Sequence, residues 1–264
     1  MSDQAVLYHV EDAIGVITLN RPDNRNGMTP ELLDAFAAAV SRVREDPDLR
    51  CVVITGSGSC FCSGADFKAT LQRGDDHHTL PHERSFAMYE PFLSVLDIEV
   101  PVIGALNGHT VGGGLGLALM CDIRIGNLEA KFGGNFARLG LHSGLGITYL
   151  LPRVVGISRA AELLFTARIF LGEEALRMGL VSEAVEPDRV LPRAMEVARE
   201  IAANAPIPVR MMKRSMYRAI DFDVRGPAWD EAFAQVITIG TEDLKEGISA
   251  LLEKRPPKFT GKLF

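Results

Sequence analysis

Glycine is concentrated in one stretch of this chain. Twelve of the 25 glycines lie between Gly104 and Gly146. Glycine weakens the interior of helices and strands, and it permits positive φ angles and close backbone approaches that side chains prevent. We therefore expect this stretch to form tight turns between regular elements, and the fold has to be one that uses them.

The composition indicates a globular protein with an apolar core. Of the 264 residues, 47% are hydrophobic and 23% are charged, as in ordinary soluble domains. The net charge of −6 argues against nucleic-acid and membrane-surface partners. No basic region precedes an apolar stretch at the N-terminus, and the most apolar stretch, residues 100–120, is interrupted by Pro101 and six glycines. We therefore expect neither a secretory signal nor a membrane span. Four cysteines make no disulfide framework here, so we expect reduced thiols in a cytoplasmic protein.

Strand and helix patterns alternate in the first half of the chain. In chain order, the predicted elements are two strands within 5–20, a helix from the N-cap Thr29 to Glu45, a strand at 51–55, a helix at 82–97, a strand at 101–106, a helix at 113–120 and a strand at 121–126. Such alternation predicts a parallel sheet built through right-handed crossovers. From Gly156 onward nearly all patterns are helical, up to a last helix capped by Thr241. We predict an α/β core, residues 1–200, followed by a helical C-terminal region, residues 201–264.

Several common site motifs are missing or incomplete. Residues 56–61 follow a buried strand as a dinucleotide-binding turn would, but Phe61 stands where the third glycine is needed. The chain contains no P-loop and no serine nucleophile elbow. Cys62 has no base near it in the sequence, so we expect a small buried thiol there. The histidines at 77, 78 and 82 fit a weak metal cluster, a pocket wall or a solvated loop. We favour the loop and predict no metal site.

Two glycine turns each follow a buried strand. The first reads FCSGADF over residues 61–67, and the second reads NGHTVGGG over residues 107–114. Together with further motifs along the chain, these turns resemble the crotonase superfamily, also called the enoyl-CoA hydratase/isomerase family. The further motifs are LNRPDNRNGM (19–28), KFG (131–133), LPRVVG (151–156) and EKR near the C-terminus. The resemblance covers essentially the whole chain. It implies an α/β fold of repeated ββα units with a helical C-terminal region, and a homotrimer or homohexamer.

The resemblance also implies a substrate and a way of activating it. Members of the family bind acyl-CoA thioesters and stabilise an enolate oxygen with two backbone N–H groups, which by motif position are those of Ala65 and Gly113. A helix that opens at Gly113 directs its positive end at such an oxygen. The other positions of the two turns that we expect to contact substrate are Ser63, Gly64, Asp66 and Gly112. The resemblance calls for no separate cofactor, because coenzyme A is part of the substrate.

Cations at family positions are expected to contact the phosphates of coenzyme A. These are Arg25, Lys68 and Lys254, the last of which can reach the coenzyme A of a neighbouring subunit. We expect the C-terminal region to take part in both trimer formation and this contact.

The sequence departs from the family where the usual acid and base belong. Family hydratases carry two glutamates, and the matching positions here are Gly116 and Phe136. Between residues 100 and 161 the carboxylates are Asp122 and Glu129, and neither falls at a catalytic position. A positioned acid or base is worth roughly 10²–10⁴ in rate, so ordinary hydration is not expected.

Other groups nearby can take over parts of the site. Histidine is the side chain whose charge changes near neutral pH, so His142 is the candidate acid or base. Asn135 and Phe136 are expected to contact the substrate. The sequence thus predicts an acyl-CoA lyase, isomerase or hydrolase of fatty acid metabolism that does not use glutamates. Two alternatives stay open: a catalytically silent acyl-CoA-binding protein, and a carbon–carbon bond hydrolase acting on a diketone without coenzyme A.

Overall fold

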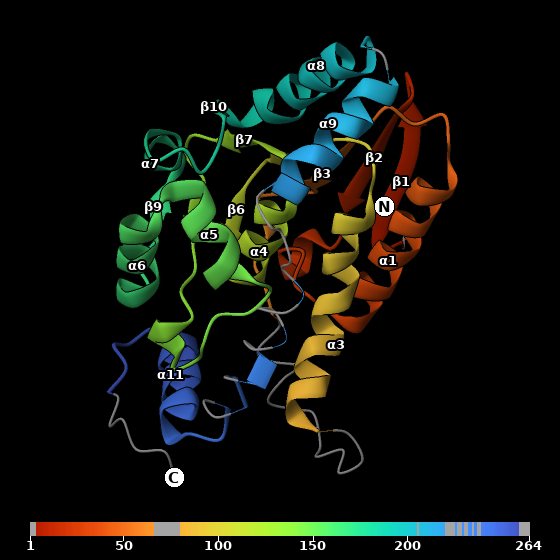
Figure 1. Cartoon of the computed structure of the whole chain (residues 1–264). Helices are drawn as coiled ribbons and strands as arrows, with labels where there is room; N and C mark the ends of the chain where they lie inside the picture. The colour runs from red at the N-terminus through yellow and green to blue at the C-terminus, as the bar shows by residue number, and fades with distance from the viewer. Residues whose placement is uncertain are drawn as a thin grey trace.

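Two β-sheets and the helices around them make up the described part of the chain (Figure 1). In this computed structural model, the described residues are 4–65, 80–204, 206–219, 225, 229, 232, 233, 235, 236 and 239–258. No helix in these ranges is long and apolar enough to cross a membrane.

The larger sheet contains the strands that the sequence predicted and one more. Its strands, in the order in which they pair, are β1 (Val6–Glu11), β2 (Ile14–Leu19), β3 (Cys51–Gly56), β5 (Val102–Leu106), β7 (Ile123–Asn127) and β10 (Glu183–Val185). β1 and β2 form an antiparallel hairpin, and every later pair is parallel. The predicted parallel sheet is confirmed, and β10 adds an edge strand inside the region that was predicted to be helical.

The smaller sheet was not predicted. Its strands, in pairing order, are β4 (Cys60–Cys62), β6 (His109–Val111), β8 (Lys131–Gly133) and β9 (Phe170–Leu171). Strands of two or three residues are too short to give a period-two pattern. β4, β6 and β8 each follow a strand of the larger sheet within a few residues, so strand pairs repeat along the chain. This repetition confirms the expected fold of ββα units.

Helices enclose the larger sheet. They are α1 (Pro30–Glu45), α3 (Pro81–Leu93), α4 (Gly113–Met120), α5 (Ile147–Val155), α6 (Ile157–Thr166), α7 (Gly172–Arg177), α8 (Val190–Ala202), α9 (Pro206–Ala219) and α11 (Glu242–Glu253), with 3-10 turns η1 (Pro22–Asn24), η2 (Ser94–Asp97), η3 (Ala137–Leu139) and η4 (Pro187–Arg189). The Oγ1 atoms of Thr29 and Thr241 each accept an N–H of the helix that follows. Both predicted N-caps are therefore confirmed.

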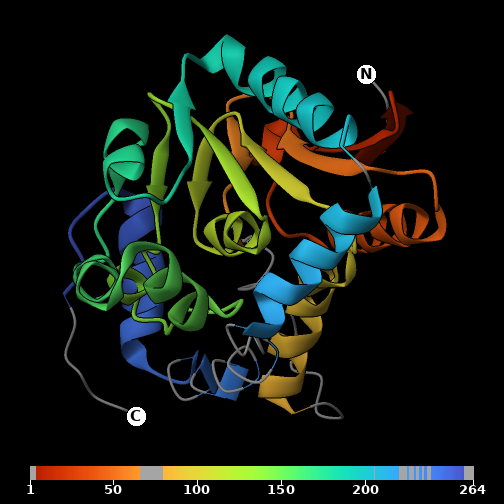
Figure 2. The ribbon, with the colours of Figure 1, turned by 45° about the horizontal axis from the view of Figure 1, so that its top comes forward.

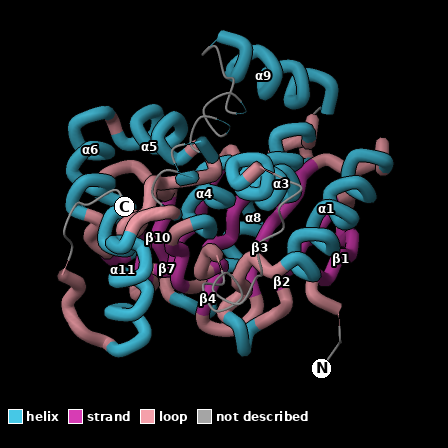
Figure 3. The backbone as a smooth tube through the Cα atoms, turned by 90° about the horizontal axis from the view of Figure 1, so that it is seen from below, coloured by secondary structure: helices cyan, strands magenta, loops and turns pink. Residues whose placement is uncertain are grey.

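Alternate residues of each strand face different helices. Ile14 and Val16 of β2 lie in a buried cluster with residues of α8, whereas Ile17 and Leu19 lie in the main core with residues of α1 and α3. Figure 2 shows α8 along one face of the sheet. The opposite face carries α4, which contacts α5 on one side and α3 on the other (Figure 3). This arrangement places α4 between α5 and α3.

Polar contacts fasten the C-terminal helices to the core. Asp122 accepts the N–H of Val102 at 2.7 Å, pairs with Lys213 at 2.8 Å, and accepts the hydroxyl of Tyr217. Asp122 therefore ties α9 to the start of β5, and these contacts are structural. α11 packs closely on η3, since a Cβ on Gly247 would lie 2.5 Å from the carbonyl oxygen of Leu139.

Candidate functional site

The two glycine turns lie in direct contact. A Cβ on Gly64 would lie 2.7 Å from the backbone nitrogen of Gly113 and 3.1 Å from the carbonyl oxygen of Val111. Gly64 has φ +82 and Gly112 has φ +58, a region that favours glycine. Met28 holds the first turn in place, because its N–H donates to the Gly64 carbonyl at 2.9 Å. The glycines thus allow two backbone segments from different sheet strands to touch.

Two backbone N–H groups remain available where these turns meet. Among the hydrogen bonds within the described residues, neither the N–H of Ala65 nor that of Gly113 has an acceptor. Gly113 is the first residue of α4, whose own first N–H groups cannot bond within the helix. Two such donors beside a helix N-terminus can stabilise a negatively charged oxygen.

Ala65 and Gly113 line a pocket of about 290 Å³. The predicted contacts Ser63, Gly112, Asn135 and Phe136 line it as well. The rest of its described wall is largely apolar: Met28, Pro81, Met88, Leu139, Leu141, Gly144, Leu145, Ile239, Leu244 and Ile248, with the polar side chains Arg84, Ser85, Tyr89 and Gln235. No aspartate or glutamate is present among these described lining residues. The described wall of the pocket therefore offers hydrogen-bonding groups and one cation, but no carboxylate base.

Gly116 and Phe136, which the resemblance matched to the expected glutamates, both lie against apolar side chains. A Cβ on Gly116 would lie 2.7 Å from the Cβ of Leu145, which is 1% exposed. Phe136 lines the pocket and packs against the main core. The structure thus closes one position with Leu145 and makes the other an apolar wall.

Tyr89 and Gln235 are pocket residues that the sequence did not reveal. Tyr89 is 2% exposed and its hydroxyl donates to the side-chain oxygen of Gln235. A Cβ on Gly144 would lie 2.4 Å from that hydroxyl, so the hydroxyl lies directly against the loop after β8. Neither residue stands in a recognisable motif, and they are separated by 146 residues. Their proximity follows from packing alone.

His142 lies beside the pocket but is not among the residues that line it. Its Nδ1 is 2.8 Å from the carbonyl oxygen of Ser143, and its own carbonyl accepts the side-chain N–H of Gln235 at 3.2 Å. His142 is therefore connected to Tyr89 through Gln235.

The predicted phosphate-binding cations do not line the pocket in the described part of the chain. Arg25 and Lys254 are exposed and lie outside the pocket lining. The carbonyl of Arg25 accepts the N–H of Ser63 at 3.1 Å, which places Arg25 beside the first glycine turn. Lys254 ends α11 with φ +56. Asp66 and Lys68 lie outside the described residues, as do His77 and His78.

The remaining titratable candidates are structural. Burial raises the pKa of the Cys62 thiol to about 12, which leaves almost no thiolate at neutral pH. His82 is buried, stacks on Phe233 with ring centroids 3.7 Å apart and meets Trp229 edge-on at 5.4 Å. Within the described ranges, no three metal-ligating side chains come together.

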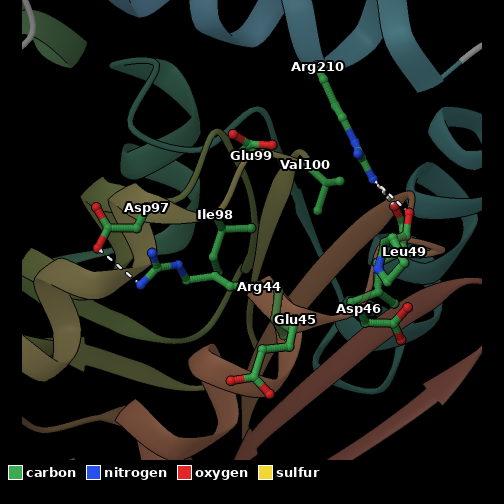
Figure 4. Close-up of a pocket in the computed structure, with 11 residues that line it drawn as sticks. Arg44, Glu45, Asp46, Leu49, Asp97, Ile98, Glu99, Val100 and Arg210 are labelled. Atoms are coloured by element: carbon green, nitrogen blue, oxygen red, sulfur yellow. Dashed lines mark hydrogen bonds and ion pairs between the residues drawn. The ribbon is translucent and has the colours of Figure 1, made fainter.

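A second cavity, of about 450 Å³, lies where α1 ends and α9 passes (Figure 4). Arg44 pairs with Asp97 at 3.8 Å, and Arg210 donates to the carbonyl oxygens of Pro47 and Leu49 at 3.1 and 3.0 Å. The Arg210 contacts join α9 to the segment after α1, and the ion pair joins α1 to η2. None of the predicted site residues lines this cavity, so the pocket at the glycine turns is the candidate active site.

Comparison with known proteins identifies the family. A sequence model of the enoyl-CoA hydratase/isomerase family matches residues 9–262. The chain belongs to this family. Among its enoyl-CoA hydratase/isomerase relatives, the (E)-benzylidenesuccinyl-CoA hydratase of Thauera aromatica is 36% identical, over 97% of this chain and 99% of its own. The crotonyl-CoA hydratase of Syntrophomonas wolfei is 35% identical, over 99% of this chain and 100% of its own.

Solved structures of the family agree with the fold. The carnitinyl-CoA hydratase from Mycobacterium avium has a TM-score of 0.86 and 33% identity, with 99% of this chain and 100% of that chain covered. An enoyl-CoA hydratase/isomerase from Pseudoalteromonas atlantica also has a TM-score of 0.86, at 27% identity. The resemblance to the crotonase superfamily and the expected fold class are thereby confirmed.

Proposed function

We propose that this chain is an enzyme that binds an acyl-CoA thioester and stabilises the enolate of its acyl group. The N–H groups of Ala65 and Gly113 would hold the thioester oxygen. The observation that carries this proposal is that both groups line one pocket and have no acceptor among the described residues. One such donor typically contributes about 3–4 kcal/mol to transition-state stabilisation.

The reaction we propose is an enolate-forming reaction other than ordinary hydration. A carboxylate pair would normally activate and add water, and the described pocket wall contains none. Thioester hydrolysis, decarboxylation and carbon–carbon bond cleavage all pass through an oxyanion or enolate without needing that pair. For proton transfer we propose Tyr89, because its hydroxyl lies at the pocket wall beside Gly144. Gln235 also donates to the backbone carbonyl of His142, the candidate from the sequence, which holds Gln235 in place against Tyr89.

A substrate panel tests the reaction class. The purified protein would be incubated with crotonyl-CoA, malonyl-CoA, acetoacetyl-CoA and a β-diketone that lacks coenzyme A, and products would be followed by mass spectrometry. We expect turnover of a malonyl or β-keto thioester and at most trace hydration of crotonyl-CoA. Efficient hydration of crotonyl-CoA would contradict the proposal. Turnover of the β-diketone alone would favour the hydrolase that does not use coenzyme A.

A catalytically silent acyl-CoA-binding protein is the second candidate. The largely apolar pocket wall favours it, because such a wall binds an acyl chain without supplying acid or base. Calorimetry with butyryl-CoA and hexanoyl-CoA, combined with the panel, separates the two: tight binding with no turnover of any thioester supports a silent binder.

We also propose that the chain assembles as a homotrimer or homohexamer. Ile157 and Phe165 of α6 are 74% and 82% exposed, and apolar side chains of this size are commonly covered in an assembly. Arg25 and Lys254 would contact the phosphates of coenzyme A, Lys254 across subunits. Analytical ultracentrifugation tests the assembly, and a monomer at micromolar concentration would contradict it.

A further inference from the structure

One side of helix α3 forms part of the pocket wall. The residues of α3 that line the pocket are Pro81, Arg84, Ser85, Met88 and Tyr89. Their spacing of three and four positions places them on a single helix face. Arg84 carries the one formal charge among the described lining residues. The acyl pocket thus has a positive charge at one position and, in its described wall, no negative charge to balance it.

The guanidinium of Arg84 is available to a ligand. It is exposed, and no described carboxylate lies within ion-pair distance of it. Its neighbour Glu83 is used in the helix cap, where its carboxylate accepts the N–H of Leu80 at 3.1 Å. An arginine side chain keeps its charge at every physiological pH and binds carboxylates in a bidentate manner.

Arg84 lies away from the thioester end of the pocket. Along α3 it precedes Tyr89, whose hydroxyl touches Gly144, by five residues, which corresponds to about 7.5 Å of helix rise. The start of α3 points away from α4, whose N-terminus is Gly113 (Figure 1). A thioester oxygen held at Ala65 and Gly113 would therefore leave the far end of the acyl group nearest to Arg84.

We propose that the acyl group carries a terminal carboxylate and that Arg84 binds it. The substrate class is then the coenzyme A monothioester of a dicarboxylic acid, with apolar carbons between the two ends that match the apolar middle of the pocket. This inference rests on the proposed binding of an acyl-CoA and adds the chemistry of its distal end. Arg84 is a specificity-determining residue and takes no part in enolate formation.

Calorimetry with matched acyl chains tests the carboxylate subsite. Adipoyl-CoA and hexanoyl-CoA have the same chain length and differ in the terminal carboxylate, and free coenzyme A reports on the phosphate contacts. We expect the unaltered protein to bind adipoyl-CoA roughly tenfold more tightly than hexanoyl-CoA, the scale of one charge-assisted hydrogen bond. Arg84→Gln should remove this preference and leave the affinity for hexanoyl-CoA unchanged, and Arg84→Lys should retain part of it.

Arg177→Gln is the matched control. Arg177 is an exposed helical arginine that pairs with Glu173 and does not line the pocket. The variant removes the same charge and should keep the preference for adipoyl-CoA.

Three results would overturn the carboxylate subsite. Equal affinities of the unaltered protein for the two thioesters would show that no carboxylate is recognised. If Arg84→Gln weakened the binding of free coenzyme A as much as that of adipoyl-CoA, Arg84 would contact the phosphates of coenzyme A. If Arg177→Gln also lost the preference for adipoyl-CoA, the preference would depend on the net charge of the protein and not on Arg84. If no thioester and no coenzyme A binds at all, the proposed function itself fails, and that result differs from each of the three.

Discussion

The side chain of Leu145 occupies the space next to Gly116. A Cβ on Gly116 would lie 2.7 Å from the Cβ of Leu145 and 3.1 Å from its Cδ1. Leu145 is buried and has φ +58, a backbone conformation that glycine adopts more easily. A small residue on α4 and a large one on the neighbouring loop are thus fitted to each other. A side chain at position 116 would therefore have to displace Leu145.

A double-mutant cycle should detect that fit. Gly116→Ala is expected to lower the free energy of unfolding by about 1–3 kcal/mol, because the new Cβ overlaps a buried side chain. Combining it with Leu145→Gly removes the atom that it meets, so the double variant should be more stable than the sum of the single effects by roughly 1 kcal/mol or more. Urea unfolding of the four proteins measures the coupling, and strict additivity would contradict the proposed overlap.

The contact between the two glycine turns should be essential for turnover. Gly64→Ala would place a Cβ 2.7 Å from the nitrogen of Gly113, which displaces one of the two N–H donors. We expect kcat to fall roughly 10²–10³-fold, as when one donor to an oxyanion is lost. Gly179→Ala is the control, since Gly179 has φ +75 but nothing within 4 Å of its Cβ position. Steady-state kinetics measures kcat in both variants. An equal fall in kcat in Gly64→Ala and Gly179→Ala would show that backbone strain alone causes the effect.

Replacing the Tyr89 hydroxyl should separate catalysis from binding. Tyr89→Phe removes the hydrogen bond to Gln235 and the proposed proton-transfer group while keeping the ring in its buried place. We expect kcat to fall roughly 10²-fold or more with little change in thioester affinity. Tyr149→Phe, at a tyrosine that stacks with Arg153 and does not line the pocket, should leave both unchanged. An unaltered kcat in Tyr89→Phe would exclude Tyr89 as the proton-transfer group.

Three buried thiols should make the folded state less stable at alkaline pH. Burial raises the pKa of Cys51, Cys62 and Cys121 from 9.0 to about 12. The unfolded chain therefore releases these protons above pH 9 while the folded chain keeps them. The associated stability is complete below pH 9 and decreases as the pH rises toward 12, by up to about 1.4 kcal/mol per pH unit for each thiol.

Urea unfolding between pH 8 and 10.5 in the presence of a reductant measures this dependence. Cys121→Ala should reduce the slope of the free energy of unfolding against pH by the contribution of one thiol. This expectation holds whatever the substitution does to stability at neutral pH. A variant whose stability falls as steeply with pH as that of the unaltered chain would show that Cys121 ionises normally in the folded state.

Local patterns determined most of the regular elements. The apolar periodicity of residues 30–45 predicted α1 at its observed bounds, the apolar stretch 113–120 predicted α4, and the Thr29 and Thr241 caps were read from single residues. The predicted helix at 82–97 ends as α3 at Leu93 and continues as a 3-10 turn. The strands of the smaller sheet were missed because they are held by neighbours across the sheet and not by a pattern of their own.

The sequence by itself determined the family and the two glycine turns, and its motif resemblance placed Gly116 and Phe136 at the positions where the usual glutamates were expected. Only the tertiary structure decided that Leu145 closes the first of these positions and that Tyr89 lies in the pocket wall. The physical reason is that torsion preferences and apolar periods act between near neighbours in the chain. The pocket wall, in contrast, depends on the packing of α3 against a loop far from it in sequence. The spacing of residues along the chain does not show that Tyr89 and this loop lie in contact.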